Sequence, residues 1–446
     1  MNAPADVRAG YGADFRRLEP TLPGAALPWL HALRQRAFDQ FMDTGFPTTR
    51  NEDWKYTDVR TLALRRFGPS DVPAPVEVQR VPRLELGGPS LVFIDGHYSP
   101  ALSQADALPG GARVMNVARA LRDHTDVIEP WLGRYTAVAH DGFRALNTAF
   151  LQDGAFVYVP RDVALEAPIE LVFVASGATD VAGYLRNVIV LEPGSRATVV
   201  ENYVTASSAE NPANLTNVVS EVITESGAEL EHYRLVREAA SAYHIGATCA
   251  HVGRSSRYIS HSVTLGGRIA RHALACVLEA EGAECRLNGL YAGSGRQHME
   301  HATRVDHHVP GCTSRAWYKG VLDDHARGVF GGRVVVHPQA QRTDASQANH
   351  NLLLSEHAEA DSRPQFEIYA DDVKCAHGSS TGSLDADALF YLRTRGLDKH
   401  AARQLLVYAF ASDVLARMRL APVRALLERD LAQRWLREES VRELLT

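Results

Sequence analysis

Lysine is the residue that this 446-residue sequence most conspicuously lacks. Only Lys55, Lys319, Lys374 and Lys399 occur, so arginine supplies almost all of the positive charge. With a net charge of −6, the chain has no basic excess of the kind that a nucleic-acid partner requires. No run of about 18 apolar residues occurs, and we expect no membrane-spanning helix. The first residues do not join a basic segment to an apolar one, so we expect no secretory signal and a cytoplasmic protein.

Cysteine is also rare. Five cysteines accompany an ordinary globular composition, with 45% hydrophobic and 22% charged residues. An odd number of thiols without an export signal is typical of a reducing compartment, where cysteines stay free. No C-x-x-C pair occurs, which argues against a structural zinc site made from cysteine pairs.

Phosphate-binding motifs are missing as well. The sequence has no G-x-x-x-x-G-K-[ST] and no G-x-G-x-x-G, and no glycine is followed by lysine. The chain therefore has no recognisable loop of its own for holding a nucleotide phosphate. If ATP hydrolysis drives its work, a partner subunit must supply the ATPase.

Residues 156–382 lack helical periodicity and consist of short runs such as IELVFVA, ATVVENYV and RVVVHP. Apolar residues alternate in these runs with the period of two that strands require. Without amphipathic helices between the strands, a doubly wound α/β fold is excluded. Turn-like elements with a small residue recur about every 14–17 residues after Gly282, which favours a parallel β-helix. A β-sandwich stays the alternative.

Helical patterns flank this region, and together they predict a mainly β protein of three parts. Residues 1–155 form an N-terminal helical and mixed region, 156–382 a parallel β-helix core, and 383–446 a C-terminal helical domain. Pro28 begins one predicted helix and Asp398 caps another, as these residue types prefer.

The predicted helix at 397–418 is apolar over more than half of its circumference. Leu406, Phe410 and Val414 make one stripe, which other apolar residues widen. A helix of this kind is buried on several sides. We expect it to cap the open end of the solenoid, either alone or while also docking a partner protein.

The stretch DVKCAHGSSTG (372–382) carries the candidate chemistry. Cys375 and His377 are two residues apart, so both side chains lie on one face of an extended strand. A thiolate and an imidazole there could hold iron, zinc or copper. Two ligands do not close a site, so the binding would be labile or would use ligands from another chain. The alternative is a buried thiol with His377 at the rim.

GSSTG also matches the G-x-S-x-G nucleophile motif, with Ser380 in the serine position. A serine hydrolase is therefore one alternative function, although His400 is the only histidine that follows and it lies in a predicted helix. We interpret the motif as a turn followed by a helix N-cap. A second alternative is a β-helix module that binds polysaccharide, which would need an exposed groove lined by aromatic residues.

Histidines are dense, with fourteen of the 19 between His232 and His377. HMEH (298–301) and DHH (306–308) resemble metal-binding motifs. On a strand, however, His298 and His301 point to opposite faces because their separation is odd. We interpret these histidines as solvent-facing side chains on a sheet.

Two longer stretches carry a family resemblance. RNEDWKYTDVRTL (50–62) and the segment from GVFGGRVVVHP through LLVYAFASDVL (328–415) resemble the SufB/SufD family of Suf iron–sulfur cluster assembly proteins. The first stretch favours the D branch of the family. The matching B-branch histidine lies between glutamates, whereas the neighbours of His377 are Ala376 and Gly378, so this chain offers fewer ligands there.

The resemblance implies a right-handed parallel β-helix and a non-catalytic scaffold or accessory subunit of a cluster-assembly complex. It implies a SufB-like paralogue and a SufC-like ABC ATPase as partners, with the last β-helix strands in the contact between the B and D subunits. His377 then takes part in iron entry or nascent cluster formation, with Cys375 as a further candidate. A transient iron ion or cluster would be shared with the partner, with no firmly bound cofactor. Flavin binding and homodimer formation stay open.

In the family that this sequence resembles, the C-terminal helices bind the ATPase. The resemblance assigns this contact to residues 384–418. The apolar candidates there are Leu389, Tyr391, Leu392, Leu405, Leu406 and Phe410.

Overall fold

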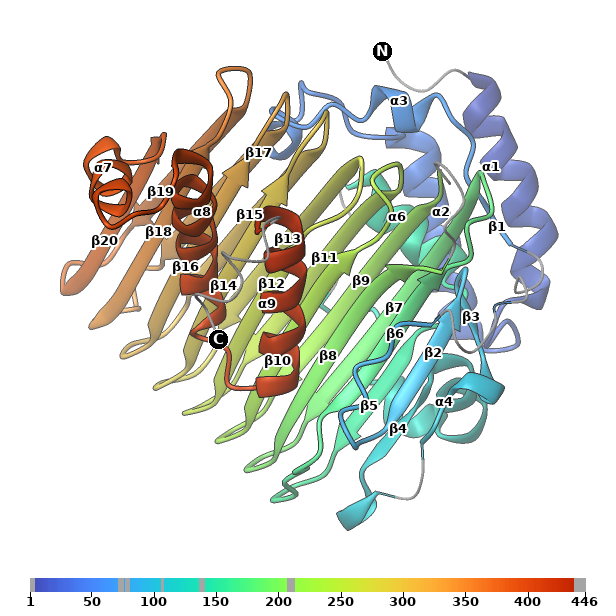
Figure 1. The fold of residues 1–446 in the computed structure, drawn as a ribbon. Coiled ribbons are helices and arrows are strands. Elements are labelled where there is room, and N and C mark those ends of the chain that lie inside the picture. The colour runs from blue at the N-terminus through green and yellow to red at the C-terminus, as the bar shows by residue number, and fades with distance from the viewer. Residues whose placement is uncertain are drawn as a thin grey trace.

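The computed structural model describes residues 5–70, 76, 81–105, 108–135, 141–206 and 213–436, and its side chains from residue 7 onward. The strands form two long sheets that face each other, with helices at both ends of the chain (Figure 1). The α-helices are α1 (Ala5–Leu18), α2 (Pro28–Thr44), α3 (Arg60–Ala63), α4 (Val117–Asp123), α5 (Thr125–Ile128), α6 (Gly142–Phe150), α7 (Ala386–Thr394), α8 (Lys399–Leu415) and α9 (Ala421–Trp435).

The strands are numbered in chain order. The first six are β1 (Gly68–Pro69), β2 (Ser90–Ile94), β3 (His97–Tyr98), β4 (Arg113–Asn116), β5 (Ala155–Val159) and β6 (Ile169–Ala175). The next seven are β7 (Val181–Leu191), β8 (Arg196–Thr205), β9 (Leu215–Thr224), β10 (Glu229–Arg237), β11 (Tyr243–Val252), β12 (Arg257–Thr264) and β13 (Ile269–Leu278). The last seven are β14 (Glu284–Gly293), β15 (His298–His307), β16 (Thr313–Leu322), β17 (Arg327–Val336), β18 (Thr343–Leu353), β19 (Glu359–Ile368) and β20 (Val373–Gly382).

From β5 onward, consecutive strands alternate between the two sheets, and each strand pairs in parallel with the strand two places later. We call the sheet of β5, β7 and so on to β19 the odd sheet, and that of β6, β8 and so on to β20 the even sheet. Antiparallel pairing among the described strands occurs only at the start, between β2 and β3 and between β4 and β5. The predicted parallel β-helix is confirmed, and the regular turn spacing in the sequence corresponds to its half-coils.

The interior between the sheets is filled by alternate residues of each strand, because successive side chains of a strand point to opposite faces. In β13, Leu274, Cys276 and Leu278 point inward and belong to the large core cluster. Corners between the strands use left-handed backbone, as at Gly282, where φ is +74°, and at Asp324, where φ is +53°. Glycine and aspartate tolerate this conformation better than branched residues do, which is why small and polar residues mark the coils in the sequence.

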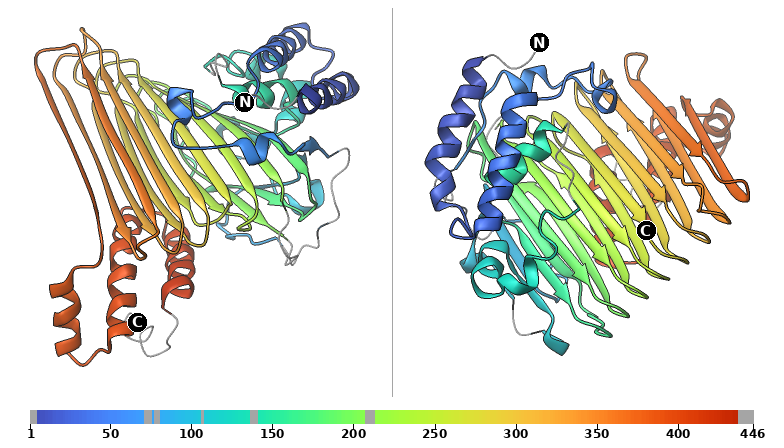
Figure 2. Two further views of the ribbon diagram at one scale, coloured as in Figure 1. Left: turned by 90° about the horizontal axis from the view of Figure 1, so that it is seen from above. Right: turned by 180° about the vertical axis from the view of Figure 1, so that it is seen from behind.

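The N-terminal helices cover the outer face of the odd sheet at its first coils, as the view from behind shows (Figure 2). α6 lies directly on β7 and β9, and all of its residues except Arg144 are buried. The Asp141 carboxylate caps it by accepting hydrogen bonds from the backbone N–H groups of Phe143 and Arg144. Asn147 donates from its amide to the backbone carbonyls of Leu185 and Asn217, which ties the helix to both strands.

The C-terminal helices do not cap the end of the solenoid, so that prediction was wrong. Instead, α8 and α9 pack on the outer face of the even sheet (Figure 1). Val407 and Val414 of α8 and Leu427 of α9 are buried with Tyr233 and other outward residues of that sheet. These strands present apolar residues on both faces, and α8 and α9 keep much of the outer set away from water.

Several local predictions for the helices were correct. α2 begins at Pro28 and ends before Gly45, which has a φ of +67°. Asp385 and Asp398 cap α7 and α8, each accepting two backbone hydrogen bonds. The predicted stripe of α8 was wrong in part: Val414 is buried, but Leu406 and Phe410 are only half-buried. No helix in the described ranges has both the length and the apolar character needed to cross a membrane.

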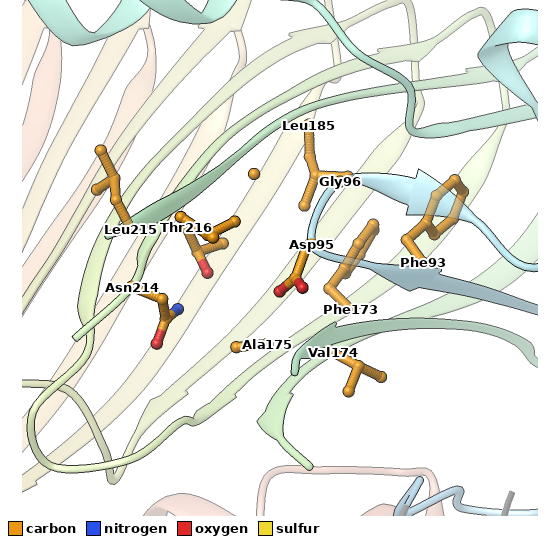
Figure 3. Close-up of a pocket in the computed structure, with 12 residues that line it drawn as sticks. Phe93, Asp95, Gly96, Phe173, Val174, Ala175, Leu185, Asn214, Leu215 and Thr216 are labelled. Carbon is orange, nitrogen blue, oxygen red and sulfur yellow. The ribbon is translucent and has the colours of Figure 1, made fainter. Parts of the chain in front are cut away.

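A small cavity lies between the sheets near the first coils (Figure 3). Phe93 and Phe173 form part of its wall, and Asp95, Asn214 and Thr216 supply polar atoms. Its volume of about 10 Å³ leaves room for no more than a single water molecule. The interior of the first coils therefore offers no ligand site here.

Candidate functional site

β20 is the last strand of the even sheet and forms one of its two edges. Among the described strands it pairs only with β18, so its other edge has no strand beside it. None of its residues is buried. An unpaired parallel edge presents a row of free backbone donors and acceptors, which is a template for pairing with another chain.

Cys375 and His377 lie on this strand and point toward the interior of the last coil, as their separation of two predicted. The His377 ring stacks on Phe366 of β19, with ring centroids 5.5 Å apart and an angle of 16° between the planes. Cys375 packs against the edge of the core and is half-buried. His377 is exposed because no further coil follows it.

The Cys375 thiol is a weak metal ligand in the isolated chain. Burial raises the pKa of the Cys375 thiol above its usual value, and the neighbouring Asp344 carboxylate adds to the effect. The thiol is therefore mostly protonated at neutral pH, and only the thiolate binds metal strongly. Among the described residues, no third histidine, cysteine or carboxylate joins this pair in a cluster that could hold a metal ion. By itself the chain offers an incomplete ligand set at this position.

The six candidate docking residues on α7 and α8 are all half-buried or exposed. α7 contains no buried residue, and Phe390 and Tyr391 on it are 67% and 56% exposed. On α8, Leu405, Leu406 and Phe410 flank the buried stripe that faces the sheet. Large apolar side chains left in water on a short helix mark a surface that can bind another protein.

Ser380 does not occupy a nucleophile turn. It lies within β20, so the predicted turn and N-cap and the hydrolase elbow are both wrong for this residue. Its hydroxyl makes a hydrogen bond of 2.7 Å with Nδ1 of His350 on β18. Among the described residues no carboxylate forms a hydrogen bond with His350, so the orienting acid of a catalytic triad is missing.

The prediction that the histidines of 298–308 face solvent was wrong for most of them. His301 and His307 are buried between the sheets, and burial lowers the pKa of His301 to about 3 and that of His307 to about 4. His298 points outward, as the odd separation predicted, but Thr57 covers it through a contact of 2.6 Å. These imidazoles are neutral parts of the packing.

Residues 50–62 form a strap across the outer face of the odd sheet. Trp54 is buried, with the Arg271 guanidinium 3.9 Å from its ring centroid. The Thr57 hydroxyl donates to Glu300, and Glu52 pairs with Arg363 of β19. This part of the sequence therefore fastens the N-terminal region to the later coils, which gives it a structural role.

A groove of about 570 Å³ lies beneath this strap on the odd sheet. It has aromatic residues in its walls, including Tyr56 and Tyr135, as the polysaccharide alternative would need. However, the arginines of the groove are already engaged: Arg304 pairs with Asp306, Arg333 with Glu367 and Arg363 with Glu52. These arginines are therefore already paired with carboxylates and are not free to select an anionic ligand.

Sequence reasoning missed one cluster. Asp306, His308 and His337 come together at a corner of the odd sheet. The DHH motif was the signal, but its third member comes from the next coil. Only the register between β15 and β17 reveals that contact.

Two family models together match most of the chain. Residues 173–410 match the family model described as "SUF system FeS cluster assembly, SufBD core domain", and residues 6–171 match that of the "SufBD protein N-terminal region". A SufBD family iron–sulfur cluster assembly protein of Synechocystis is 33% identical over 406 residues, covering 88% of both chains.

Two relatives carry the name SufD. The Escherichia coli iron–sulfur cluster assembly protein SufD is 31% identical over 391 residues, which cover 86% of this chain and 88% of the relative. The SufD of Bacillus subtilis is 28% identical over 406 residues, which cover 87% and 90%. On this evidence, the chain belongs to the SufBD family of iron–sulfur cluster assembly proteins.

Proposed function

We propose that this chain is a non-catalytic scaffold subunit of a cytoplasmic Suf cluster-assembly complex. In this complex β20 joins a SufB-like paralogue, α7 and α8 hold a SufC-like ABC ATPase, and His377 contributes to iron entry or nascent cluster formation. The iron ion or cluster is the cargo of the complex, shared across the subunit contact.

The open edge at β20 is the observation that carries this proposal. Natural edge strands are protected from unwanted pairing by charges, proline or bulges. β20 contains no proline, and its one charged residue, Lys374, lies near its start. An exposed strand of ten residues without such protection is suited to pairing with a partner strand.

The incomplete ligand set supports sharing of the cargo. His377 is held by its stack on Phe366 yet remains accessible from outside. A second subunit placed against β20 could add ligands beside it and complete a coordination shell. A weak, open set of ligands also suits a scaffold that must release its product.

The position of α7 supports a link between ATP hydrolysis and the cluster site. Only residues 383–385 separate β20 from α7. α8 is fixed to the sheet by the ion pair of Lys319 with Asp413, at 2.9 Å. Movement of an ATPase bound to α7 would therefore be passed through residues 383–385 to β20, the strand that carries His377.

The test of the site is His377→Ala in the complex purified without oxygen. We expect lower iron and sulfide content per complex, with unchanged subunit composition. His350→Ala is the matched control, since this histidine lies on the adjacent strand but on the outer face. Iron and sulfide contents of H377A equal to those of H350A and the native complex would remove His377 from the function.

The test of the ATPase contact is Tyr391→Ala combined with Phe390→Ala. We expect weaker co-purification of a SufC-like ATPase, with an unchanged unfolding midpoint of the isolated chain. Tyr369→Ala is the control, because this tyrosine is 62% exposed but lies just after the end of β19, away from α7 in the sequence. Equal ATPase recovery with the native chain, the double variant and the Tyr369→Ala control would argue against docking on α7.

A fluorophosphonate probe addresses the non-catalytic assignment. We expect no labelling of Ser380, because its histidine partner has no acid to orient it. Stoichiometric labelling at this serine, lost in His350→Ala, would favour the hydrolase alternative instead.

A further inference from the structure

Three side chains that can bind metal lie together at one corner of the solenoid. Asp306 and His308 lie at the end of β15, and His337 follows the end of β17 on the next coil. The ligand atoms that they offer all lie within 4.8 Å of one another. In-register parallel pairing brings them together, since His307 lies opposite Val336 and the two histidines follow in step.

The geometry points to a binding site for a divalent first-row transition metal ion at Asp306, His308 and His337. Two imidazoles and one carboxylate, with further positions open to water, form a donor set that suits ions such as Fe²⁺, Zn²⁺ and Co²⁺. The site lies on other strands than Cys375 and His377, and it does not depend on the proposed assembly role.

The spacing of Asp306 and His337 fits ligands better than a hydrogen bond. Asp306 Oδ1 lies 3.6 Å from His337 Nε2, which is too long for a hydrogen bond. Two ligands of a tetrahedral ion with bonds of about 2.1 Å stand about 3.4 Å apart. Nε2 of His337 is buried and has no hydrogen-bond partner among the described residues. An ion between the two groups would satisfy this nitrogen.

His308 completes the set from the exposed side. Its ring stacks on His337, with centroids 4.2 Å apart and planes 29° apart. Because the side chain is exposed, it can rotate toward an ion without disturbing the core.

Arg304 fixes the orientation of the Asp306 carboxylate. Its guanidinium donates to both oxygens of Asp306, at 2.7 and 2.9 Å. Each oxygen keeps a second lone pair for a metal ion. Hydrogen bonding of this kind to a ligand fixes its orientation.

The opposite corner of the solenoid supplies a matched control. His325 and His357 also stack on successive coils, with centroids 4.8 Å apart and planes 6° apart. Among the described residues, no carboxylate or other ligand completes a cluster with them. A stacked histidine pair alone is therefore present in the same chain without the third ligand.

The experiment is a Co²⁺ titration of the untagged full chain after chelator treatment, followed by visible absorption and calorimetry. Cys375→Ser with His377→Ala serves as the background, so that the proposed cluster site does not contribute. We expect binding of one Co²⁺, weakened at least about tenfold by His308→Ala, His337→Ala or Asp306→Asn. The double variant of His325→Ala and His357→Ala should bind like the background protein.

Circular dichroism and the thermal midpoint check that each variant is folded. Co²⁺ binding that is equal in the background protein and in the folded His308→Ala and His337→Ala variants would overturn the site. Loss of binding in the His325 and His357 double variant would overturn it as well. Failure of the His377 test leaves this result untouched, so the two proposals can fail separately.

Discussion

The first and last coils of the solenoid contain the same kind of strand but differ completely in their surroundings. Every residue of β9 (Leu215–Thr224) is buried, whereas no residue of β20 (Val373–Gly382) is. In the first coils, helices cover the outer faces and further coils lie on both sides. At the last coil, the even sheet simply ends (Figure 2).

The difference shows how one architecture separates stability from interaction. The covered coils bury charged side chains, and each such charge needs a partner of opposite sign. Arg186, for example, pairs with Glu221 at 2.8 Å. The open coil holds small and polar residues, a stacked histidine and free backbone groups. The early coils therefore stabilise the fold, whereas the last coil leaves an unpaired edge, which the proposed function assigns to a partner.

The largest expected effect comes from breaking the buried ion pair of the first coils. Arg186→Ala should lower the free energy of unfolding by about 3–5 kcal/mol, because Glu221 stays buried without its cation. Arg333→Ala is the control in the later coils, where the pair with Glu367 is partly exposed and worth about 0–1 kcal/mol. Urea unfolding measures both, and equal losses would contradict the comparison.

The second prediction compares two leucines of the C-terminal helices. Leu427 of α9 is fully buried against the even sheet, so Leu427→Ala should cost about 2–5 kcal/mol through the lost contacts and the cavity. Leu389→Ala on α7 should change stability by less than about 1 kcal/mol, since this side chain is half-exposed. A similar loss of thermal midpoint in both variants would mean that α7 is part of the core.

A smaller effect concerns the interior histidines. The pKa of His301 falls from 6.5 to about 3 on folding, because burial and then the nearby Arg234 disfavour its charged form. Between these two values the unfolded chain binds a proton that the folded chain excludes. Stability contributed in this way is present above pH 6.5 and is lost as pH falls toward 3.

Urea midpoints at pH 7 and pH 5 test this dependence. We expect the native chain to lose stability at the lower pH and His301→Gln to lose less, although the variant starts from a lower midpoint. An identical pH dependence in both proteins would contradict the assignment to His301.

The sequence predicted the features that depend on local pattern. Alternation along each strand and the regular turn spacing were enough for a parallel solenoid, and the cap Asp398 could be predicted directly. The same period of two placed Cys375 and His377 on one face. Each of these features is decided by neighbours along the chain.

Features that depend on distant contacts could not be predicted in this way. The face of α8 that packs, with Val407 rather than Leu406, depends on which sheet it meets. The burial of His301 depends on which face of β15 points inward, and alternation alone does not say so. His337 reaches Asp306 only because β15 and β17 pair in one register.

Hydrogen–deuterium exchange tests the central claim most directly, with the full chain measured alone and in complex with a SufB-like paralogue. We predict that residues 373–382 exchange quickly in the isolated chain and become protected in the complex, while the amides of β9 stay protected in both. Protection that appears on other surfaces while β20 continues to exchange would contradict the account.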